Sequence, residues 1–103
     1  MADQPMVRIA EIEVDPGQIE AYNTLLAEVG AASVRDEPGV LMLHSVSLQD
    51  APHHIRVFEV YASRAAYEAH IQTPHFLKYK TGTSDMVTAL RLIEVDPILL
   101  AAK

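Results

Sequence analysis

Residues 67–76 read YEAHIQTPHF and place two histidines, His70 and His75, on either side of a helix break. The residue before a proline is disfavoured in the helical region, whereas proline itself suits the first position of a helix. We therefore expect His70 to close one helical segment and His75 to open the next. Both side chains titrate near neutral pH, so a backbone break that presents them suits the wall of a small-molecule site.

Strand patterns lie on both sides of this helical region and set the fold. Segments rich in valine and isoleucine and bounded by turn residues predict strands at 6–14, 40–48, 55–61 and 88–96. Helical patterns separate the first strand from the second and the third from the fourth. The order β-α-β-β-α-β with right-handed crossovers predicts an α+β, ferredoxin-like fold, in which helices cover one face of a four-stranded antiparallel sheet.

Capping residues define the ends of the predicted helices. Asp15-Pro16 should open the first helix, and Glu37-Pro38-Gly39 should stop it. Ser63 should cap the second helical region. Residues 49–53 are expected to form a loop, which would leave His53 and His54 as a solvated pair.

Composition and charge narrow the class of protein. The chain has 103 residues, enough for one domain, which we expect over 7–95 with tails at 1–6 and 96–103. A net charge of −6 without any basic block argues against a nucleic-acid partner. The absence of cysteine excludes disulfides and thiolate chemistry. Apolar runs are too short to span a bilayer and no signal-peptide pattern is visible, so we expect a cytoplasmic protein with no membrane partner.

The sheet face that the helices leave open is expected to be apolar as well. Strand 55–61 carries Ile55 and Val57 on one face and Phe58 and Val60 on the other. Strand 40–48 is expected to place His44 on the same face as Val40, Met42 and Val46. Large exposed apolar patches usually mark interfaces, and two-fold assemblies are the commonest, so the pattern predicts a homodimer to which the apolar tail 98–102 could contribute.

Two histidines and one glutamate are the candidate catalytic groups. His70 and His75 could bind or deprotonate a substrate hydroxyl. The structural alternative is a hydrogen-bonded helix residue for His70 and an exposed first-turn residue for His75. Glu59 stands among apolar neighbours, where a carboxylate must find a partner or shift its pKa. It could form a salt bridge to an arginine or, if it faces the helices, pair with His70 or His75.

Aromatic side chains could line a cavity for a flat apolar or aromatic ligand, although the same residues could equally form ordinary core. The candidates are Tyr22, Phe58, Tyr67, Phe76, Tyr79 and Met86, with His44 as a further polar contact. Histidine pairs that bind metal on a helix usually lie four residues apart, and this pair is five apart across a proline. No glycine-rich nucleotide motif occurs. We therefore expect neither a metal nor a cofactor.

Residues 58–61 (FEVY) and 67–76, together with Asp15-Pro16-Gly17 at the start of the first helix, resemble the antibiotic biosynthesis monooxygenase family. The likeness extends over about residues 7–95 and is strongest to stand-alone, quinol-monooxygenase-like members. The resemblance implies a dimeric α+β barrel, in which two ferredoxin-like sheets pack face to face. It also implies oxidation of quinols or polyketide-like aromatics by dioxygen without metal or flavin, the substrate carbanion itself reducing the oxygen.

The leading interpretation is a cofactor-independent monooxygenase that oxidises a small quinol, phenolic or polyketide-like compound with dioxygen. His70 and His75 would take the hydroxyl proton, because a phenolate gives up an electron to dioxygen more readily than a phenol, and Glu59 would orient a ring. Two alternatives stay open: an isomerase of a small carbonyl compound such as a signalling sugar, and a non-catalytic ligand-binding dimer. Only the isomerase would turn over without oxygen, and the binding protein would not turn over at all.

Overall fold

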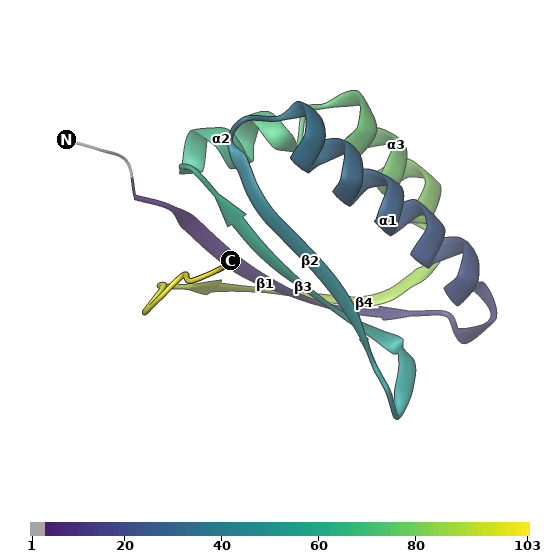
Figure 1. Ribbon diagram of the computed structural model, residues 1–103. Coiled ribbons are helices and arrows are strands. Elements are labelled where there is room, and N and C mark those ends of the chain that lie inside the picture. Colours follow the sequence, from purple (N-terminus) through teal and green to yellow (C-terminus); the bar gives the residue numbers. More distant parts are fainter. Residues whose placement is uncertain (1–3) are drawn as a thin grey trace.

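The computed structural model describes residues 4–103 and has a four-stranded antiparallel sheet with helices on one face (Figure 1). The strands are β1 (Met6–Val14), β2 (Val40–Leu48), β3 (Ala51–Tyr61) and β4 (Val87–Val95). The helices are the 3-10 turn η1 (Pro16–Gln18), α1 (Ile19–Asp36), α2 (Arg64–His70) and α3 (Pro74–Thr83). The sheet order β2-β3-β1-β4 is that of the expected ferredoxin-like fold. The first three residues of the predicted tail 1–6 lie outside the described residues, and Met6 belongs to β1.

Side-chain caps explain where the helices begin. The Asp15 carboxylate accepts a hydrogen bond from the Gly17 backbone N–H at 3.0 Å, ahead of η1 and α1. The Ser63 hydroxyl accepts one from the Ala66 backbone N–H at 3.1 Å at the start of α2. Thr73 caps α3, with Pro74 at the first helical position. The Thr73-Pro74 step therefore separates α2 from α3, as the sequence predicts.

The turn between β2 and β3 is tighter than the expected loop over 49–53. The antiparallel pairing of these strands continues to Leu48 opposite Ala51, so β3 begins at Ala51. Pro52, which has no N–H to donate, is tolerated because β1 pairs with β3 only from His54 onward and leaves one side of this end free. The prediction that His53 and His54 lie in a loop was wrong: both belong to β3, and the His54 ring lies 3.3 Å from the Glu13 carboxylate.

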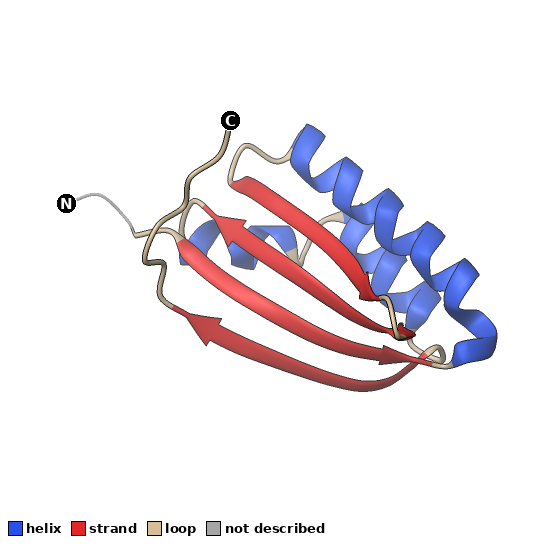
Figure 2. Cartoon of the chain, turned by 60° about the horizontal axis from the view of Figure 1, so that its bottom comes forward, coloured by secondary structure: helices blue, strands red, loops and turns tan. Residues whose placement is uncertain are grey.

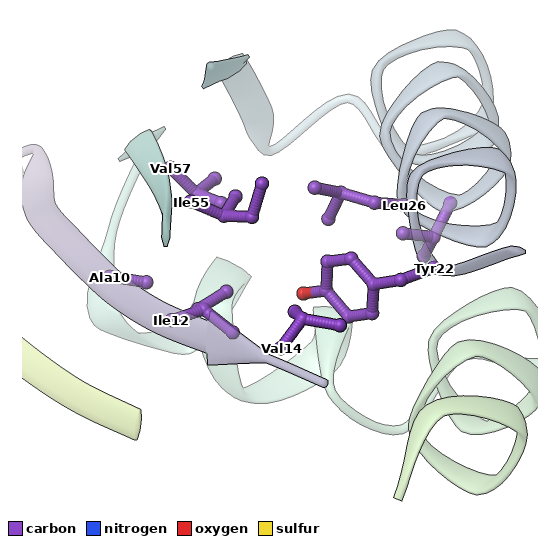
Figure 3. Close-up of a cluster of buried hydrophobic side chains, with 8 residues drawn as sticks. Ala10, Ile12, Val14, Tyr22, Leu26, Ile55 and Val57 are labelled. Carbon is purple, nitrogen blue, oxygen red and sulfur yellow. The ribbon is translucent and has the colours of Figure 1, made fainter. Parts of the chain in front are cut away.

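The hydrophobic core lies between the sheet and α1. Ala10, Ile12 and Val14 of β1 and Ile55 and Val57 of β3 meet the buried face of α1, as Figure 3 shows; the residues that α1 contributes are Tyr22, Leu26 and Val29. Burying each large aliphatic side chain contributes about 1.5–3 kcal/mol. The core therefore fixes the register of β1, β3 and α1 relative to one another.

A register shift in β2 changes the face of its first residue. Val40 lies opposite Tyr61, whereas Met42 lies opposite Val60, so the residue between them has no partner in the ladder. Val40 consequently faces the helices and is buried, and the expectation that it shares a face with Met42 was wrong. Just before it, Gly39 lies against α2, where an added Cβ would stand 2.5 Å from the Ala66 Cβ.

The open face of the sheet, which Figure 2 shows without any helix over it, is apolar at one end and charged at the other. The ladder registers place an apolar set there, namely Val7, Ile9, Met42, Phe58, Val60, Ile93 and Val95. Towards the other end, the Glu11 carboxylate lies 3.4 Å from the Arg56 guanidinium and 3.7 Å from that of Arg91. The expected second apolar face is thus present over part of the sheet. No helix in residues 4–103 is long and apolar enough to cross a membrane.

Candidate functional site

A cavity of about 380 Å³ lies between the sheet and the pair formed by α1 and α3. Its floor comes from β1, β3 and β4 and includes Ala10, Ile12 and Val57. Its roof includes Phe76 and Tyr79 of α3. Leu90 and Leu92 also line it and are about half exposed, because no helix covers the β4 edge of the sheet. The cavity is therefore largely apolar; its titratable groups are Arg8, Glu59, Tyr61, Tyr67, His70, Tyr79 and Lys80.

Glu37 gathers both histidines of the helix break around one carboxylate oxygen. Its Oε2 atom lies 3.0 Å from Nδ1 of His70 and 2.5 Å from Nε2 of His75. Glu37 directly follows α1, His70 ends α2, and His75 is in the first turn of α3. One side chain therefore ties three helices together at the break.

The environment of Glu37 keeps it ionised. Burial opposes the charge, but the hydrogen bonds from His70 and His75 outweigh that effect and hold the pKa of Glu37 below its usual value. An ionised carboxylate only accepts hydrogen bonds, so Nδ1 of His70 and Nε2 of His75 are the nitrogens that carry protons. A neutral His70 then has its lone pair on Nε2.

The Nε2 atom of His70 is the ring nitrogen without a hydrogen-bond partner among residues 4–103, whereas every fully buried side-chain nitrogen or oxygen of those residues has one. His70 is only 4% exposed and lines the cavity. Aromatic rings hold the imidazole in place, with centroid distances of 5.1 Å to Phe76 and 5.4 Å to Tyr61. The fixed ring and its oriented lone pair are the geometry that a general base requires.

A second polar group lies near His70 on the cavity wall. The Tyr61 hydroxyl donates to Oε1 of Glu59 at 2.6 Å. Burial raises the pKa of Glu59, although the hydrogen bond from Tyr61 and the charge of Arg8 partly offset it. The Arg8 guanidinium lies 4.3 Å from the centre of the Tyr67 ring and pairs with the Glu94 carboxylate at 2.5 Å. Both Arg8 and Glu59 line the cavity, which gives it one polar end.

Two tyrosine hydroxyls meet near the roof of the cavity. The hydroxyl of Tyr22, on α1, lies 2.6 Å from that of Tyr79, on α3. Tyr22 is completely buried, and Figure 3 shows its ring reaching from α1 toward the core residues of β1. Tyr79 lines the cavity and Tyr22 stands behind it.

The structure separates the sequence-predicted site residues into two groups. Glu59, Tyr67, His70, Phe76 and Tyr79 line the cavity. Glu59 faces the helices, as one alternative required, but its hydrogen bond goes to Tyr61 and to neither histidine.

The other predicted residues do not line the cavity. The ring of His75 is directed to Glu37, and Met86 packs against the core beyond the end of α3. His44 and Phe58 are paired across β2 and β3, and both side chains point to the open side of the sheet, because side chains alternate along a strand. We therefore leave His75, Met86, His44 and Phe58 out of the candidate site.

Glu37 is the site residue that the sequence did not reveal. Its Pro38-Gly39 neighbours mark a helix end, which already accounts for a polar residue at that position. Its distance of 33 residues from His70 and 38 from His75 gives no periodic signal. The sequence alone does not show which residues a carboxylate at the end of a helix will pair with.

Glu37, His70 and His75 are also the described residues best placed to hold a metal ion. Their ligand atoms lie within 4.8 Å of one another, and two histidines with one carboxylate match a common zinc donor set. In the structure the same atoms are joined by hydrogen bonds, with protons on the two nitrogens.

The fold and the site define a class of protein, a ferredoxin-like domain with a ligand-sized cavity between its helices and its sheet. Comparison with known proteins identifies the family. Residues 5–82 match the model of the antibiotic biosynthesis monooxygenase family, and the chain belongs to that family. A crystal structure from Bacteroides thetaiotaomicron, of a protein provisionally assigned to the same family, has 47% sequence identity and a TM-score of 0.94. The match covers 97% of this chain and 95% of that one.

More distant relatives have the same architecture. A structure from Pseudomonas aeruginosa is 26% identical, with a TM-score of 0.86 over 96% of this chain and 99% of the other. An uncharacterized protein of Synechocystis is 29% identical over 97 residues, which are 94% of this chain. This chain spans 65% of the length of that protein.

Proposed function

We propose that this protein is a cofactor-independent monooxygenase that oxidises a small quinol, phenolic or polyketide-like compound with dioxygen. Membership of the antibiotic biosynthesis monooxygenase family supports the reaction class. The size of the cavity, about 380 Å³, and its largely apolar wall support a small aromatic ligand.

The observation that carries the proposal is the orientation of His70. Glu37 accepts the Nδ1 proton, so Nε2 is the basic nitrogen of a ring that lines the cavity. A substrate hydroxyl placed against Nε2 gives up its proton there, and the resulting phenolate is the electron-rich form that reduces dioxygen. His75 secures Glu37 from the other side. In this proposal His75 is a positioning residue and not the base.

The overall step balances without an external reductant. For the probe 1,4-dihydroxynaphthalene, one molecule of diol and one of dioxygen give 2-hydroxy-1,4-naphthoquinone and one molecule of water. A new carbon–oxygen bond forms at ring position 2, and the second oxygen atom leaves as water. The ring supplies all four electrons that dioxygen accepts. Glu59 lies at the polar end of the cavity, where its carboxyl group can orient a ring hydroxyl.

Labelled dioxygen tests the proposal with this probe. The wild-type chain should incorporate one labelled atom into the hydroxynaphthoquinone, faster than the uncatalysed reaction. Replacing His70 with asparagine should lower the rate by about a hundredfold or more, the usual loss when a general base is removed. His44→Asn is the matched control, because His44 lies on the open face of the sheet. Equal rates for the two variants would remove the assigned base.

The distribution of label and the need for oxygen separate the rival functions. Unlabelled naphthoquinone with hydrogen peroxide would indicate a quinol oxidase and would overturn the insertion of oxygen. Turnover of a small carbonyl compound under anaerobic conditions would instead indicate an isomerase. Binding without turnover of any quinol or phenol in a panel would indicate a ligand-binding protein.

The proposal does not require a bound metal. We expect full activity after dialysis against a chelator, with substoichiometric metal by elemental analysis. Loss of activity on dialysis and its recovery with zinc would show instead that Glu37, His70 and His75 bind a metal ion that the reaction needs.

We further propose that two copies pair through their open sheet faces. The apolar end of that face supports this pairing, since Phe58 at its centre is 39% exposed. The Ile98 and Leu99 side chains, which are 102% and 79% exposed, add apolar surface beside it. Sedimentation at micromolar concentration should give twice the mass of 11.4 kDa, and a monomer alone would exclude this pairing.

A further inference from the structure

The hydroxyl pair of Tyr22 and Tyr79 has two protons and only one hydrogen bond between its members. The two oxygens lie 2.6 Å apart, so one hydroxyl donates and the other accepts. The accepting hydroxyl still has a proton of its own. No other hydrogen bond within 3.5 Å joins either hydroxyl to residues 4–103. Burial raises the pKa of Tyr79, and the Thr83 side chain lies near enough to offset part of that rise.

Burial decides which hydroxyl donates. Tyr22 is 0% exposed and surrounded by core side chains, so a proton that its oxygen did not donate to Tyr79 would have no acceptor. A buried donor left without a partner destabilises the folded chain, because it loses its hydrogen bond to water and gains none in return. Tyr79 lines the cavity and can direct its proton there. Tyr22 is therefore the donor to Tyr79, and the Tyr79 proton is free for a group inside the cavity.

The Tyr79 oxygen is also held in place. Its ring meets Tyr22 edge to face at a centroid distance of 6.0 Å and lies 6.1 Å from the Phe76 ring. A hydroxyl that already accepts one hydrogen bond donates its own proton more strongly, because neighbouring bonds polarise one another. The pair thus presents one directed donor to the cavity.

We propose that Tyr79 donates a hydrogen bond to an oxygen acceptor of the bound ligand and that Tyr22 positions the Tyr79 hydroxyl for this contact. This inference rests on the proposed function only in taking the cavity as the ligand site. It makes the site two-sided: Nε2 of His70 accepts a proton, and Tyr79 donates one to a different oxygen.

The chemical class of the ligand follows from these two contacts. Removing a hydroxyl proton at His70 leaves a negative charge, and conjugation spreads that charge to a second oxygen on the same frame. A donor at that second oxygen stabilises the developing charge. The preferred ligand therefore has a hydroxyl and a carbonyl, or a second ring oxygen, joined through a conjugated ring.

A matched pair of probes tests the contact without any turnover. The aryl ketone 1-tetralone and the hydrocarbon tetralin have the same ring frame and differ only at the oxygen. Their dissociation constants can be measured by ligand-observed NMR on the wild-type chain and on four variants, namely Tyr79→Phe, Tyr22→Phe, the double variant of these two, and His44→Asn as the control. The quantity of interest is the preference for the ketone, the ratio of the tetralin constant to the tetralone constant.

The wild-type chain should prefer the ketone, and Tyr79→Phe should reduce that preference by about three- to tenfold, as expected for one neutral hydrogen bond. Tyr22→Phe should reduce it by a smaller factor, and the double variant should show no loss beyond that of Tyr79→Phe. His44→Asn, on the open face of the sheet and outside the cavity, should leave the preference unchanged.

Three results would overturn the inference. These are a wild-type chain without preference for the ketone, an unchanged preference in Tyr79→Phe, and an equal loss in His44→Asn. A lower melting temperature of Tyr79→Phe with an unchanged preference would leave the hydroxyl pair as a purely structural link between α1 and α3. The binding test measures only the ketone preference and does not involve proton removal at His70, so the oxygenase proposal can fail while the Tyr79 contact holds, and the reverse.

Discussion

Replacing Glu37 with glutamine should destabilise the fold, because one carboxylate oxygen receives hydrogen bonds from two imidazole rings. Hydrogen bonds to charged groups contribute about 1.5–3 kcal/mol each, and a glutamine amide can keep one weaker bond in this place. We therefore expect a loss of about 2–3 kcal/mol in the free energy of unfolding at pH 7. For a domain of this size that loss lowers the melting temperature by roughly 10–20 °C.

The pH dependence of this loss identifies the charge as its cause. The pKa of Glu37 is lowered in the folded chain. A carboxyl group whose pKa falls on folding contributes stability above its unfolded pKa, near 4.3, and that stability disappears as the pH drops through the folded value. Urea denaturation from pH 7 down to pH 3 should therefore show the wild type and Glu37→Gln converging as the solution becomes acidic.

Glu28→Gln is the matched control. Glu28 is on α1 and pairs with Lys78 of α3 at 2.6 Å, but both side chains are at least half exposed. Such surface pairs contribute about 0–1 kcal/mol. A Glu37→Gln variant no less stable than this control would refute the view that Glu37 joins the three helices. So would a difference from the wild type that did not change with pH.

The remaining predictions concern the sheet, the carboxyl group of Glu59 and the turn before β2. Phe58→Asp should give folded monomers in place of the proposed dimer because Phe58 faces outward, whereas Val57→Asp should unfold the chain because Val57 is in the core. Sedimentation and circular dichroism distinguish the two results. The pKa of Glu59 is raised in the folded chain, so ionisation of Glu59 destabilises the wild type as the pH rises through that pKa. Glu59→Gln lacks this loss and should therefore become more stable relative to the wild type at higher pH. Parallel thermal melts at pH 4 and pH 8 measure the difference. Gly39→Ala should cost about 1–3 kcal/mol through the contact with Ala66, and Ala66→Gly in the same chain should restore part of it; urea denaturation of both variants measures the recovery.

Local signals in the sequence predict most of the fold. Asp15, Ser63 and Thr73 act through neighbours two or three residues away, so their capping roles can be read directly from the chain. The alternation within the third strand groups Glu59 with Ile55 and Val57, but it leaves open which face of the sheet they share. The shift between Val40 and Met42 has no local mark, since it depends on pairing with Tyr61 and Val60 of β3.

The candidate site is harder to predict because its geometry depends on distant residues. The histidines stand out through the Thr73-Pro74 step, but which ring faces the cavity depends on Glu37, across the α1–β2 turn. Tyr22 and Tyr79 could be proposed as aromatic contacts. That one stands behind the other follows only from the packing of α1 on α3.

The cavity leaves α3 without a continuous apolar floor. The helix packs on α1, and the space beneath it is filled by neither the sheet nor a side chain. A ligand of the right shape would supply those missing contacts and act as a removable part of the core. At a concentration one hundred times its dissociation constant it would add about 2.7 kcal/mol to stability. Thermal melting of the protein with a compound library therefore provides a search for the natural substrate that needs no knowledge of the reaction.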